Sequence, residues 1–457
     1  MNKKSRIPVS KGQQLEIKIE ELNHQGEGVG RHEGFTIFVP QTVPGDEIIS
    51  RVISVQKNYA RAVVENLVSA SPHRIVPVCE HFEKCGGCQL QHLDYAEQLK
   101  YKQKIVYNAL KRIGGLDVTV LPVIGMASPW QYRNKAQVPI GTVNGKVQAG
   151  FFEKGSHNIV DLNNCHIQHP VNDQVVHTVR KLLQELKISV YNENAHRGLV
   201  RHIVARTSFA TGEVLVIIVT NGRELPETKK LITALRANIN NLVGIVQSIN
   251  TRRGNAILGQ EEKTLWGQPY LIEKLGSLTF RLSPRSFFQV NPQQTEILYQ
   301  KAKEYAKLQG QETVFDLYCG IGSIALFVAD VAAKVIGVEI VESAVEDARQ
   351  NAKLNDISNV EFHTGAAEEV VPRLYQQGYK ADVVLVDPPR KGCDDRLLKT
   401  MAAMQPERIV YISCNPATLA RDLKYLTAHG FTVIEVQPVD MFPQTAHVET
   451  VVLMSRK

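Results

Sequence analysis

The sequence predicts a multidomain protein with a small N-terminal β-barrel (residues 1–70), a central α+β domain (71–285) and a C-terminal α/β Rossmann-like domain (286–457). Its 457 residues exceed what one hydrophobic core usually supports. The apolar pattern also changes twice along the chain, from strand-like alternation, through a mixed region, to regular strand–helix alternation. These two observations predict three domains.

The first 70 residues have the pattern of a small barrel. Residues 11–68 alternate polar and apolar side chains in short runs such as LEIKIEEL, FTIFVP and DEIISRVISV, with the glycine-rich turn GEGVG after the first run. Short strands and tight turns in so short a segment predict a barrel, a shape that often presents a nucleic-acid surface. A purely structural barrel is the alternative.

The central segment is mixed and basic. A helix is predicted around residues 94–113 and β-rich runs include YRNKAQVPIG and VLVIIVTNG, but the internal topology does not follow from the pattern. Residues 71–285 carry 27 basic and 16 acidic side chains, whereas residues 286–457 carry 17 and 22. This difference indicates that the middle of the chain binds a polyanion, with a solvated basic face as the alternative.

The composition bounds the location and the partners. The chain has no run of about 18 apolar residues and no apolar leader after its basic start, so we expect a cytoplasmic protein without a membrane partner. Its seven cysteines are too few for a disulfide scaffold. We also expect a monomer.

A ligand loop is predicted at the start of the C-terminal alternation. The loop DLYCGIGS (316–323) follows a predicted strand and opens a helix, where doubly wound folds bind their ligands. Dinucleotide dehydrogenases use a similar loop, but Asp316 would repel a pyrophosphate and suits the ammonium group of S-adenosylmethionine. Glu339 ends the next strand, where a carboxylate accepts hydrogen bonds from ribose hydroxyls, unless it merely ends the strand. The sequence therefore predicts S-adenosylmethionine as the cofactor.

Two further strand ends carry residues suited to chemistry. DPPR (387–390) places Asp387 after one strand on a loop that its prolines make rigid, and SCNP (413–416) places Cys414 after the next. A thiol near a helix N-terminus is expected to have a lowered pKa and to act as a nucleophile, although buried cysteines are often structural. We interpret Cys319 and Cys393 as structural. Glu449, at the start of the last predicted strand, is the candidate base.

With these motifs the sequence resembles the RNA uracil-5 methyltransferases over essentially its whole length. The resemblance rests on SFFQVN (286–291), DLYCGIGS, DPPR, SCNP and HVE (447–449). It implies an OB-like TRAM barrel, a cysteine-bearing central domain that binds RNA, and a class I methyltransferase domain. The cysteine-bearing domain is more similar to the large-subunit (23S) ribosomal RNA branch, which includes dual-site members, than to the transfer RNA branch.

The resemblance also implies the site. Gln289, Tyr318, Glu339 and Asp387 are expected to bind S-adenosylmethionine, Cys414 to add to carbon 6 of uracil and Glu449 to remove the proton from carbon 5. A further polar donor contact found in some relatives has no counterpart in TGAAEE (364–369).

The cysteine cluster is a candidate metal site. Cys79, Cys85 and Cys88 lie close together in the sequence and Cys165 follows much later, which gives four thiolate ligands for zinc or for an iron–sulfur cluster. The spacing resembles the 4Fe–4S site of the family, so we expect a 4Fe–4S cluster with a structural role. Zinc or metal-free thiols are the alternatives.

The RNA partner is expected to contact the central domain. Arg133 and Lys135 in YRNK, and the segment Arg197–Arg206 with His196, Arg201 and His202, combine cations with rings that suit phosphates and unstacked bases. A uridine in a stem must leave the stack, so an inserted side chain or a refolded loop is predicted.

Rival functions are kept open. They are a transfer RNA uracil-5 methyltransferase, an RNA cytosine-5 methyltransferase, which usually has threonine before the cysteine, and a non-catalytic RNA-binding protein, which needs none of Cys414, Glu449 and Asp387.

Overall fold

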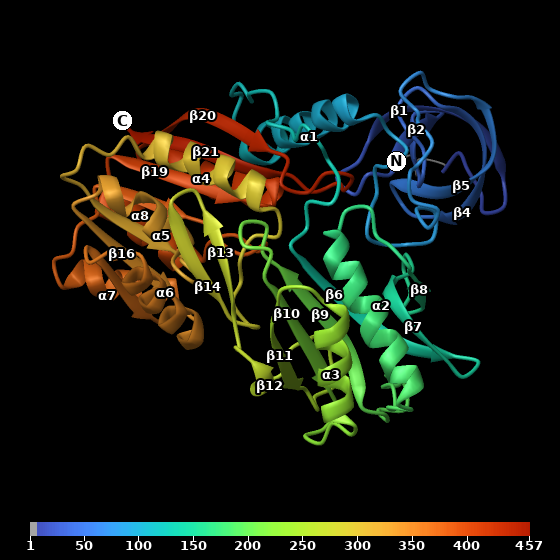
Figure 1. Ribbon diagram of the computed structural model, residues 1–457. Helices are drawn as coiled ribbons and strands as arrows, with labels where there is room; N and C mark the ends of the chain where they lie inside the picture. Colours follow the sequence, from blue (N-terminus) through green and yellow to red (C-terminus); the bar gives the residue numbers. More distant parts are fainter. Residues whose placement is uncertain (1–6) are drawn as a thin grey trace.

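The computed structural model describes residues 7–457 and contains three packed units (Figure 1). A closed barrel, a seven-stranded central sheet and a seven-stranded C-terminal sheet follow one another along the chain. The predicted multidomain fold class is confirmed. No helix in this described range is long and apolar enough to cross a membrane.

The N-terminal barrel has the strand order β1-β2-β3-β5-β4. Its strands are β1 (Gln14–Leu22), β2 (Gly28–His32), β3 (Phe35–Val39), β4 (Glu47–Val55) and β5 (Tyr59–Ser69). The alternation in β1 turns Leu15, Ile17 and Ile19 into the core, and β3 pairs in parallel with β5 to close the barrel. The end of the predicted turn motif belongs to β2, where close packing requires glycine because a Cβ on Gly30 would lie 2.1 Å from Cγ2 of Ile17.

The central sheet has the strand order β12-β11-β10-β9-β6-β7-β8. Its strands are β6 (Lys135–Val143), β7 (Lys146–Phe152), β8 (Ile159–Asp161), β9 (Val200–Thr207), β10 (Val214–Thr220), β11 (Leu242–Ile249) and β12 (Glu261–Gly267). Helices α2 (Pro170–Glu185) and α3 (Thr228–Asn238) cover one face. Alternate residues of β10 pack on these helices and toward the C-terminal domain, so the whole strand is buried.

The C-terminal sheet has the strand order β17-β16-β15-β18-β19-β21-β20. Its strands are β15 (Thr313–Leu317), β16 (Lys334–Glu339), β17 (Val360–Thr364), β18 (Val383–Val386), β19 (Arg408–Ser413), β20 (Phe431–Val439) and β21 (Glu449–Arg456). The first five are parallel, and β21 lies antiparallel between β19 and β20.

Helices cover both faces of this sheet, as the alternation predicts. One face carries α4 (Pro292–Ala306), α5 (Ser323–Val328) and α6 (Glu342–Leu354), and the other carries α7 (Ala367–Gln376), α8 (Asp395–Met404) and α9 (Pro416–Ala428). The strand order reverses between β15 and β18, which places a ligand crevice at the carboxyl ends of these strands.

The predicted central domain (71–285) contributes both of its ends to the C-terminal core. Helix α1 (Tyr95–Ala109) continues as a π-helical turn (Leu110–Gly114) and packs with α9 beneath the C-terminal sheet. The hairpin of β13 (Leu271–Leu275) and β14 (Leu278–Leu282) packs on the opposite face with α4. Residues far apart in the sequence therefore share one hydrophobic core.

The barrel is attached through the segment that precedes α1. Arg74 Nη2 lies 2.6 Å from Oδ2 of Asp46, whose side chain is fully buried in the barrel. The Tyr101 hydroxyl on α1 donates to the carbonyl of Asn23 at 2.7 Å. In Figure 1, α1 accordingly lies between the barrel and the β20–β21 edge of the C-terminal sheet.

Candidate active site

Five of the predicted residues meet at one edge of the C-terminal sheet. Asp316 lies near the carboxyl end of β15, Glu339 ends β16, Asp387 follows β18 and Cys414 follows β19. Glu449 begins β21, which runs antiparallel to β19 and therefore starts where β19 ends. Parallel strands share one direction, so their carboxyl ends place these side chains on a common rim.

The glycine-rich loop after β15 leaves open space for a ligand. The amides of Tyr318 and Cys319 donate to the carbonyl of Val338 at 2.9 and 3.1 Å, which folds the loop over β16. Tyr318 has a left-handed backbone (φ 66°), as does Gly320 (φ 55°). A Cβ at Gly320 would meet no heavy atom within 4 Å, so the backbone there faces a free volume.

Glu339 is held at the edge of this volume by backbone amides. Its Oε2 accepts a hydrogen bond from the amide of Gly320 at 3.1 Å and its Oε1 accepts one from Val341 at 2.8 Å. Each carboxylate oxygen can accept more than one bond, so the half-buried carboxylate retains acceptor capacity for ligand hydroxyls.

The rim carries an excess of buried carboxyl groups. Asp316 is 1% exposed and neither of its carboxyl oxygens has a hydrogen-bond partner; burial, with the Asp387 and Glu339 charges, raises its pKa well above the usual value. Burial and the charge of Asp387 likewise raise the pKa of Glu449, which is 3% exposed with a free Oε2. Burial raises the pKa of Asp387 to about 7. Buried carboxyl groups without partners favour a cationic ligand.

Cys414 faces these carboxyl groups. Burial, together with the charges of Glu449 and Asp387, raises the pKa of the half-buried thiol to about 11, and Arg390 opposes this effect. The expectation of a lowered pKa at the start of α9 is therefore wrong. Burial and two carboxyl groups outweigh the helix terminus.

The loops that carry Asp387 and Cys414 are tied to each other. The Asn415 side chain donates to the carbonyl of Arg390 at 2.9 Å, and Thr418 Oγ1 donates to the same carbonyl at 3.2 Å. The side-chain oxygen of Asn415 also accepts from the amide of Ala417 at 3.1 Å and caps α9. One residue therefore joins the DPPR loop, the SCNP loop and the helix.

The two other cysteines of this domain are enclosed. Cys319 is 5% exposed and Cys393 is 4% exposed. The Cys393 amide donates to Asp422 at 2.8 Å, and its sulfur lies 3.5 Å from the Tyr411 hydroxyl. Their surroundings suit the structural roles expected for them.

The SFFQVN segment presents one aromatic ring to solvent and buries the next. Phe287 is 67% exposed, whereas Phe288 is 4% exposed and Gln289 is 6% exposed. Asn134 donates through its side chain to the Gln289 carbonyl at 3.1 Å and through its amide to the Val290 carbonyl at 2.8 Å. The sequence-based argument missed Asn134 as a support for this loop and Phe287 as an exposed ring. The only local signal was the pair of adjacent phenylalanines.

Buried and half-buried side chains alternate along the YRNK segment. Tyr132 and Asn134 are buried, whereas Arg133 and Lys135 are half-buried. Within residues 7–457, no carboxylate lies at salt-bridge distance from either cation. Burial and the charges of Arg206 and Arg133 lower the pKa of Lys135 well below its usual value. The Arg133 guanidinium is therefore free to meet an anion, whereas burial favours the neutral form of the Lys135 amine.

Two arginines of the second predicted RNA segment are buried and donate hydrogen bonds to backbone carbonyls inside the protein. Arg201 is 5% exposed and donates to the carbonyls of Asn250 and Arg252, both at 2.7 Å. Arg206 is 3% exposed and donates to the carbonyl of Ser286. The expectation that these two arginines contact RNA is wrong, because their guanidinium groups are enclosed and bonded to backbone.

The four cysteines of the predicted metal site share one neighbourhood. Cys88 packs with Phe82, Tyr132 and Ile167, and Cys79 and Cys165 pack against that group. Burial, together with the charges of neighbouring cysteines, raises the pKa of Cys88 and of Cys165 to about 12.

The cysteines do not converge as metal ligands in this arrangement. Across residues 7–457 no three cysteine, histidine or carboxylate side chains are placed to hold a metal ion. The expected 4Fe–4S site of Cys79, Cys85, Cys88 and Cys165 is thus not supported by the side-chain positions. Burial raises the pKa of three of these thiols, those of Cys85, Cys88 and Cys165.

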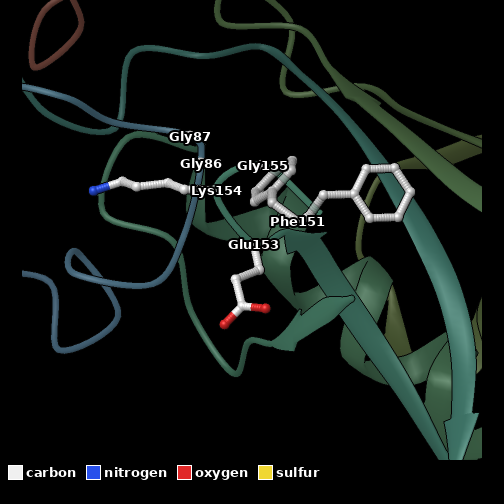
Figure 2. A pocket seen from close by; sticks show the side chains of 7 residues that line it. Gly86, Gly87, Phe151, Glu153, Lys154 and Gly155 are labelled. Carbon is white, nitrogen blue, oxygen red and sulfur yellow. The ribbon is translucent and has the colours of Figure 1, made fainter. Parts of the chain in front are cut away.

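An open groove of about 470 Å³ lies beside the cysteine segment rather than at the rim. It is bounded by Gly86 and Gly87 on one side and by residues 151–155 on the other. Figure 2 shows the side chains of Glu153 and Lys154, which directly follow β7, pointing in different directions. Lys154 Nζ donates to the Phe82 carbonyl at 2.9 Å, so its charge braces the cysteine loop.

Comparisons with known proteins agree with this geometry. The family described as tRNA (Uracil-5-)-methyltransferase matches residues 94–457, and the TRAM domain matches residues 8–64. An uncharacterized RNA methyltransferase of Halalkalibacterium halodurans is 50% identical over 455 residues, which cover 99% of each chain. Another from Clostridium tetani is 47% identical over 452 residues, which cover 99% of this chain and 98% of the relative.

A solved structure is similar over nearly the full length. It is the tRNA (uracil-54, C5)-methyltransferase of Pyrococcus abyssi in complex with S-adenosyl-L-homocysteine. The two chains are 31% identical, with a TM-score of 0.77 and coverage of 96% of this chain and 100% of the other.

Proposed function

Because this chain belongs to the RNA uracil-5 methyltransferase family, we propose that it methylates carbon 5 of uracil in 23S ribosomal RNA through a covalent adduct with Cys414. Family membership makes it an S-adenosylmethionine-dependent RNA methyltransferase with a TRAM domain and an RNA partner. The RNA, the covalent route and the residue roles are the proposal.

One observation carries the covalent route, namely that a thiol and two carboxyl groups meet at the rim. The charges of Glu449 and Asp387 both act on the Cys414 thiol, and Arg390 is the nearby cation. A protein that only bound RNA would not require a thiol and a buried base beside a ligand volume.

Cys414 and Glu449 act in sequence in this proposal. The Cys414 thiolate forms a bond to carbon 6 of uracil, and the electrons of the carbon 5–carbon 6 double bond move into the enolate of the ring. Carbon 5 then accepts the methyl group and holds both the methyl group and its proton. Glu449 removes that proton, the double bond re-forms and the thiolate leaves carbon 6. A buried carboxylate with a raised pKa suits this base.

The rim fits S-adenosylmethionine. When bound, this cofactor supplies a methyl group on a cationic sulfur. The unpartnered oxygens of Asp316 and the free volume at Gly320 fit a cationic ligand with hydrogen-bond donors. We assign its binding to Gln289, Tyr318, Glu339 and Asp387, and Asp316 adds charge complementarity.

RNA is proposed to approach through the basic central domain. Arg133 supplies unpaired positive charge, Lys135 gains a proton when a phosphate approaches it, and Phe287 supplies an exposed ring two residues before Gln289. An exposed ring suits insertion into the stack that a flipped uridine leaves. The TRAM barrel is the second part of the chain that we assign to RNA binding.

Transfer RNA is the second candidate substrate. The Pyrococcus abyssi enzyme acts on uracil 54 of tRNA and covers nearly the whole of this chain. The 23S assignment depends on the cysteine-bearing central segment with its Cys79, Cys85, Cys88 and Cys165.

The test supplies labelled S-adenosylmethionine with unmodified 23S RNA or tRNA, followed by nucleoside analysis by mass spectrometry. We expect 5-methyluridine in 23S RNA, no label with Cys414→Ala, and a denaturation-resistant protein–RNA adduct that accumulates with Glu449→Gln.

Other outcomes have defined meanings. Label in tRNA alone would identify tRNA as the substrate. Label as 5-methylcytidine would contradict uracil as the target base. A folded, cofactor-binding protein that labels neither RNA would overturn the catalytic proposal in favour of an RNA-binding role.

We also propose that the four cysteines bind a 4Fe–4S cluster, which requires the thiols to lose their protons and close around it. Their shared neighbourhood supports this proposal. Iron and acid-labile sulfide in protein purified without oxygen are the expected result. Zinc alone, or no metal, would contradict it, and no step of the methylation depends on it.

A further inference from the structure

The loop between β20 and β21 leads directly to the proposed base. It spans residues 440–448, and the two residues that flank it, Val439 and Glu449, are paired across the strands. Glu449 Oε2 has no hydrogen-bond partner. The place of its carboxylate thus depends largely on where the backbone of this loop and of β21 lies.

A fully buried ion pair holds the first residue of this loop. Lys102 Nζ on α1 lies 2.5 Å from Oδ1 of Asp440, and both side chains are 0% exposed. The same ammonium group donates to the Phe442 carbonyl at 3.0 Å, and the Tyr95 hydroxyl donates to Oδ2 of Asp440 at 2.9 Å.

The middle of the loop is held by the segment before α1 and by α1 itself. Gln98 donates to the side-chain oxygen of Gln444 at 3.0 Å and accepts from the Gln444 amide at 3.2 Å. The amides of Gln89 and Leu90, which directly follow Cys88, both donate to the Gln444 carbonyl at 3.0 Å.

Two more anchors come from other parts of the chain. The Tyr132 hydroxyl donates to the Pro443 carbonyl at 2.9 Å, and the Asn291 side chain donates to the Met441 carbonyl at 3.0 Å. The β20–β21 loop is thus fixed by groups outside the two strands that it connects. Figure 1 shows α1 next to these strands.

The chemistry of the Lys102–Asp440 pair indicates a positioning role. Removing two charges from water costs about as much free energy as their attraction returns, so such a pair adds little net stability. It does specify one geometry, because any shift of the loop would leave a buried charge without its partner.

We propose that Lys102 and Gln98 are positioning residues for Glu449, which they act on through the β20–β21 loop. The inference rests on the proposed function, since it assigns these residues to the step in which Glu449 removes the proton from carbon 5. They touch neither RNA nor cofactor in this proposal.

The experiment compares Lys102→Met with Lys100→Met in the full-length protein. Lys100 lies on the same helix, is 70% exposed and pairs with Glu97 at 2.5 Å, so it controls for the loss of one lysine from α1. Turnover, KM for RNA and for cofactor, and the fraction of RNA in a methylated covalent adduct are measured. Gln98→Leu gives a second, uncharged perturbation of the loop.

A misplaced base slows the release of the adduct but not its formation. We expect kcat to fall about tenfold to 100-fold in Lys102→Met, as for a misplacement of about 1 Å, with both KM values changed less than about twofold. The methylated adduct should accumulate as in Glu449→Gln, to a lesser degree in Gln98→Leu, and not in Lys100→Met. Lys102→Arg should recover part of the turnover.

Failure of this inference differs from failure of the proposed function. If Glu449→Gln forms no adduct, the covalent route itself is wrong. If Glu449→Gln accumulates adduct while Lys102→Met and Gln98→Leu turn over normally, or lose adduct formation and turnover together, the positioning role is overturned.

Discussion

Cys414 lies half-buried after β19, where Glu449 and Asp387 act on its thiol. A thiol with a pKa of about 11 is almost entirely neutral at physiological pH. Relief of the carboxylate repulsion, by protonation or by a bound cation, lowers that pKa. At the residue scale, then, the nucleophile depends on the charge of its two neighbours.

Alkylation of Cys414 tests this dependence. The pKa is raised, so the reactive thiolate is scarce below it, and the rate with iodoacetamide should rise with pH up to about pH 11. Asp387→Asn removes one repelling charge and should increase the rate at pH 8 about threefold to tenfold. Peptide mass spectrometry assigns the label to Cys414. Asp330→Asn, whose carboxylate pairs with Lys303 on the surface, should leave the rate unchanged, and a plateau below pH 8 would contradict the raised pKa.

Gly320 tests the free volume at the rim. Gly320→Ala should destabilise the protein by about 1–2 kcal/mol, the cost of a side chain in a left-handed conformation, and its methyl group should obstruct the cofactor. Gly115→Ala is the matched control, because Gly115 has φ 68° and equally open surroundings far along the chain. Calorimetric titration with S-adenosylhomocysteine should show weaker binding for Gly320→Ala alone. Equal binding in the two variants would place the cofactor elsewhere.

At the scale of elements, the strands of the C-terminal sheet contribute to the site mainly through the loops at their ends. The loops after β15, β16, β18 and β19 face one crevice, and β21 returns Glu449 to it. Asn415 joins two of these loops and caps α9, so the start of the helix and the site are one hydrogen-bonded unit.

Asn415→Ala separates stability from positioning. Loss of the cap should cost about 1 kcal/mol of unfolding free energy. Loss of the shorter of the two hydrogen bonds to the Arg390 carbonyl should let the DPPR loop shift, which lowers kcat by about tenfold. Asp394→Ala, which removes the cap of α8, should lose stability without loss of kcat. Chemical denaturation and single-turnover kinetics measure the two effects. If both variants lose stability and kcat to the same extent, Asn415 acts only as the cap of α9.

The whole molecule combines a basic middle with an acidic C-terminal third. Residues 71–285 have 27 basic and 16 acidic side chains, and Arg133 and Lys135 lie in this part next to the loop that carries Gln289. The Tyr101 hydroxyl on α1 donates to the Asn23 carbonyl of the barrel, so the barrel is joined to the helix that packs on the C-terminal sheet.

The salt dependence of RNA binding tests the role of Arg133. Arg133→Ala should weaken binding at every sequence tested and reduce the slope of log K against log salt by about one, because one phosphate is no longer neutralised. Lys181→Ala is the control, because Lys181 lies on α2, is 67% exposed and faces Glu185 at 3.7 Å. Filter binding at several salt concentrations measures both slopes. An unchanged slope in Arg133→Ala would remove this residue from the interface.

Much of the architecture was predictable because its signals are local. The alternation in β1, the runs that become β15, β16, β18 and β19, and the turn residues after them are readable within short windows. The helix predicted around residues 94–113 matches α1 and its π-helical extension closely. Helices α2 and α3 were not assigned, because the central strands are buried on both faces and lose their alternation.

The sequence by itself determined the fold class, the family and the residues of the rim, since consecutive parallel strands must bring their carboxyl ends to one edge. Only the tertiary structure decided the direction of the Cys414 pKa, the enclosure of Arg201 and Arg206, and the spacing of the four thiols. The buried ion pair between Lys102 and Asp440 also follows only from the tertiary structure. These properties depend on burial and on contacts between distant segments, and no local pattern of side chains records either of them.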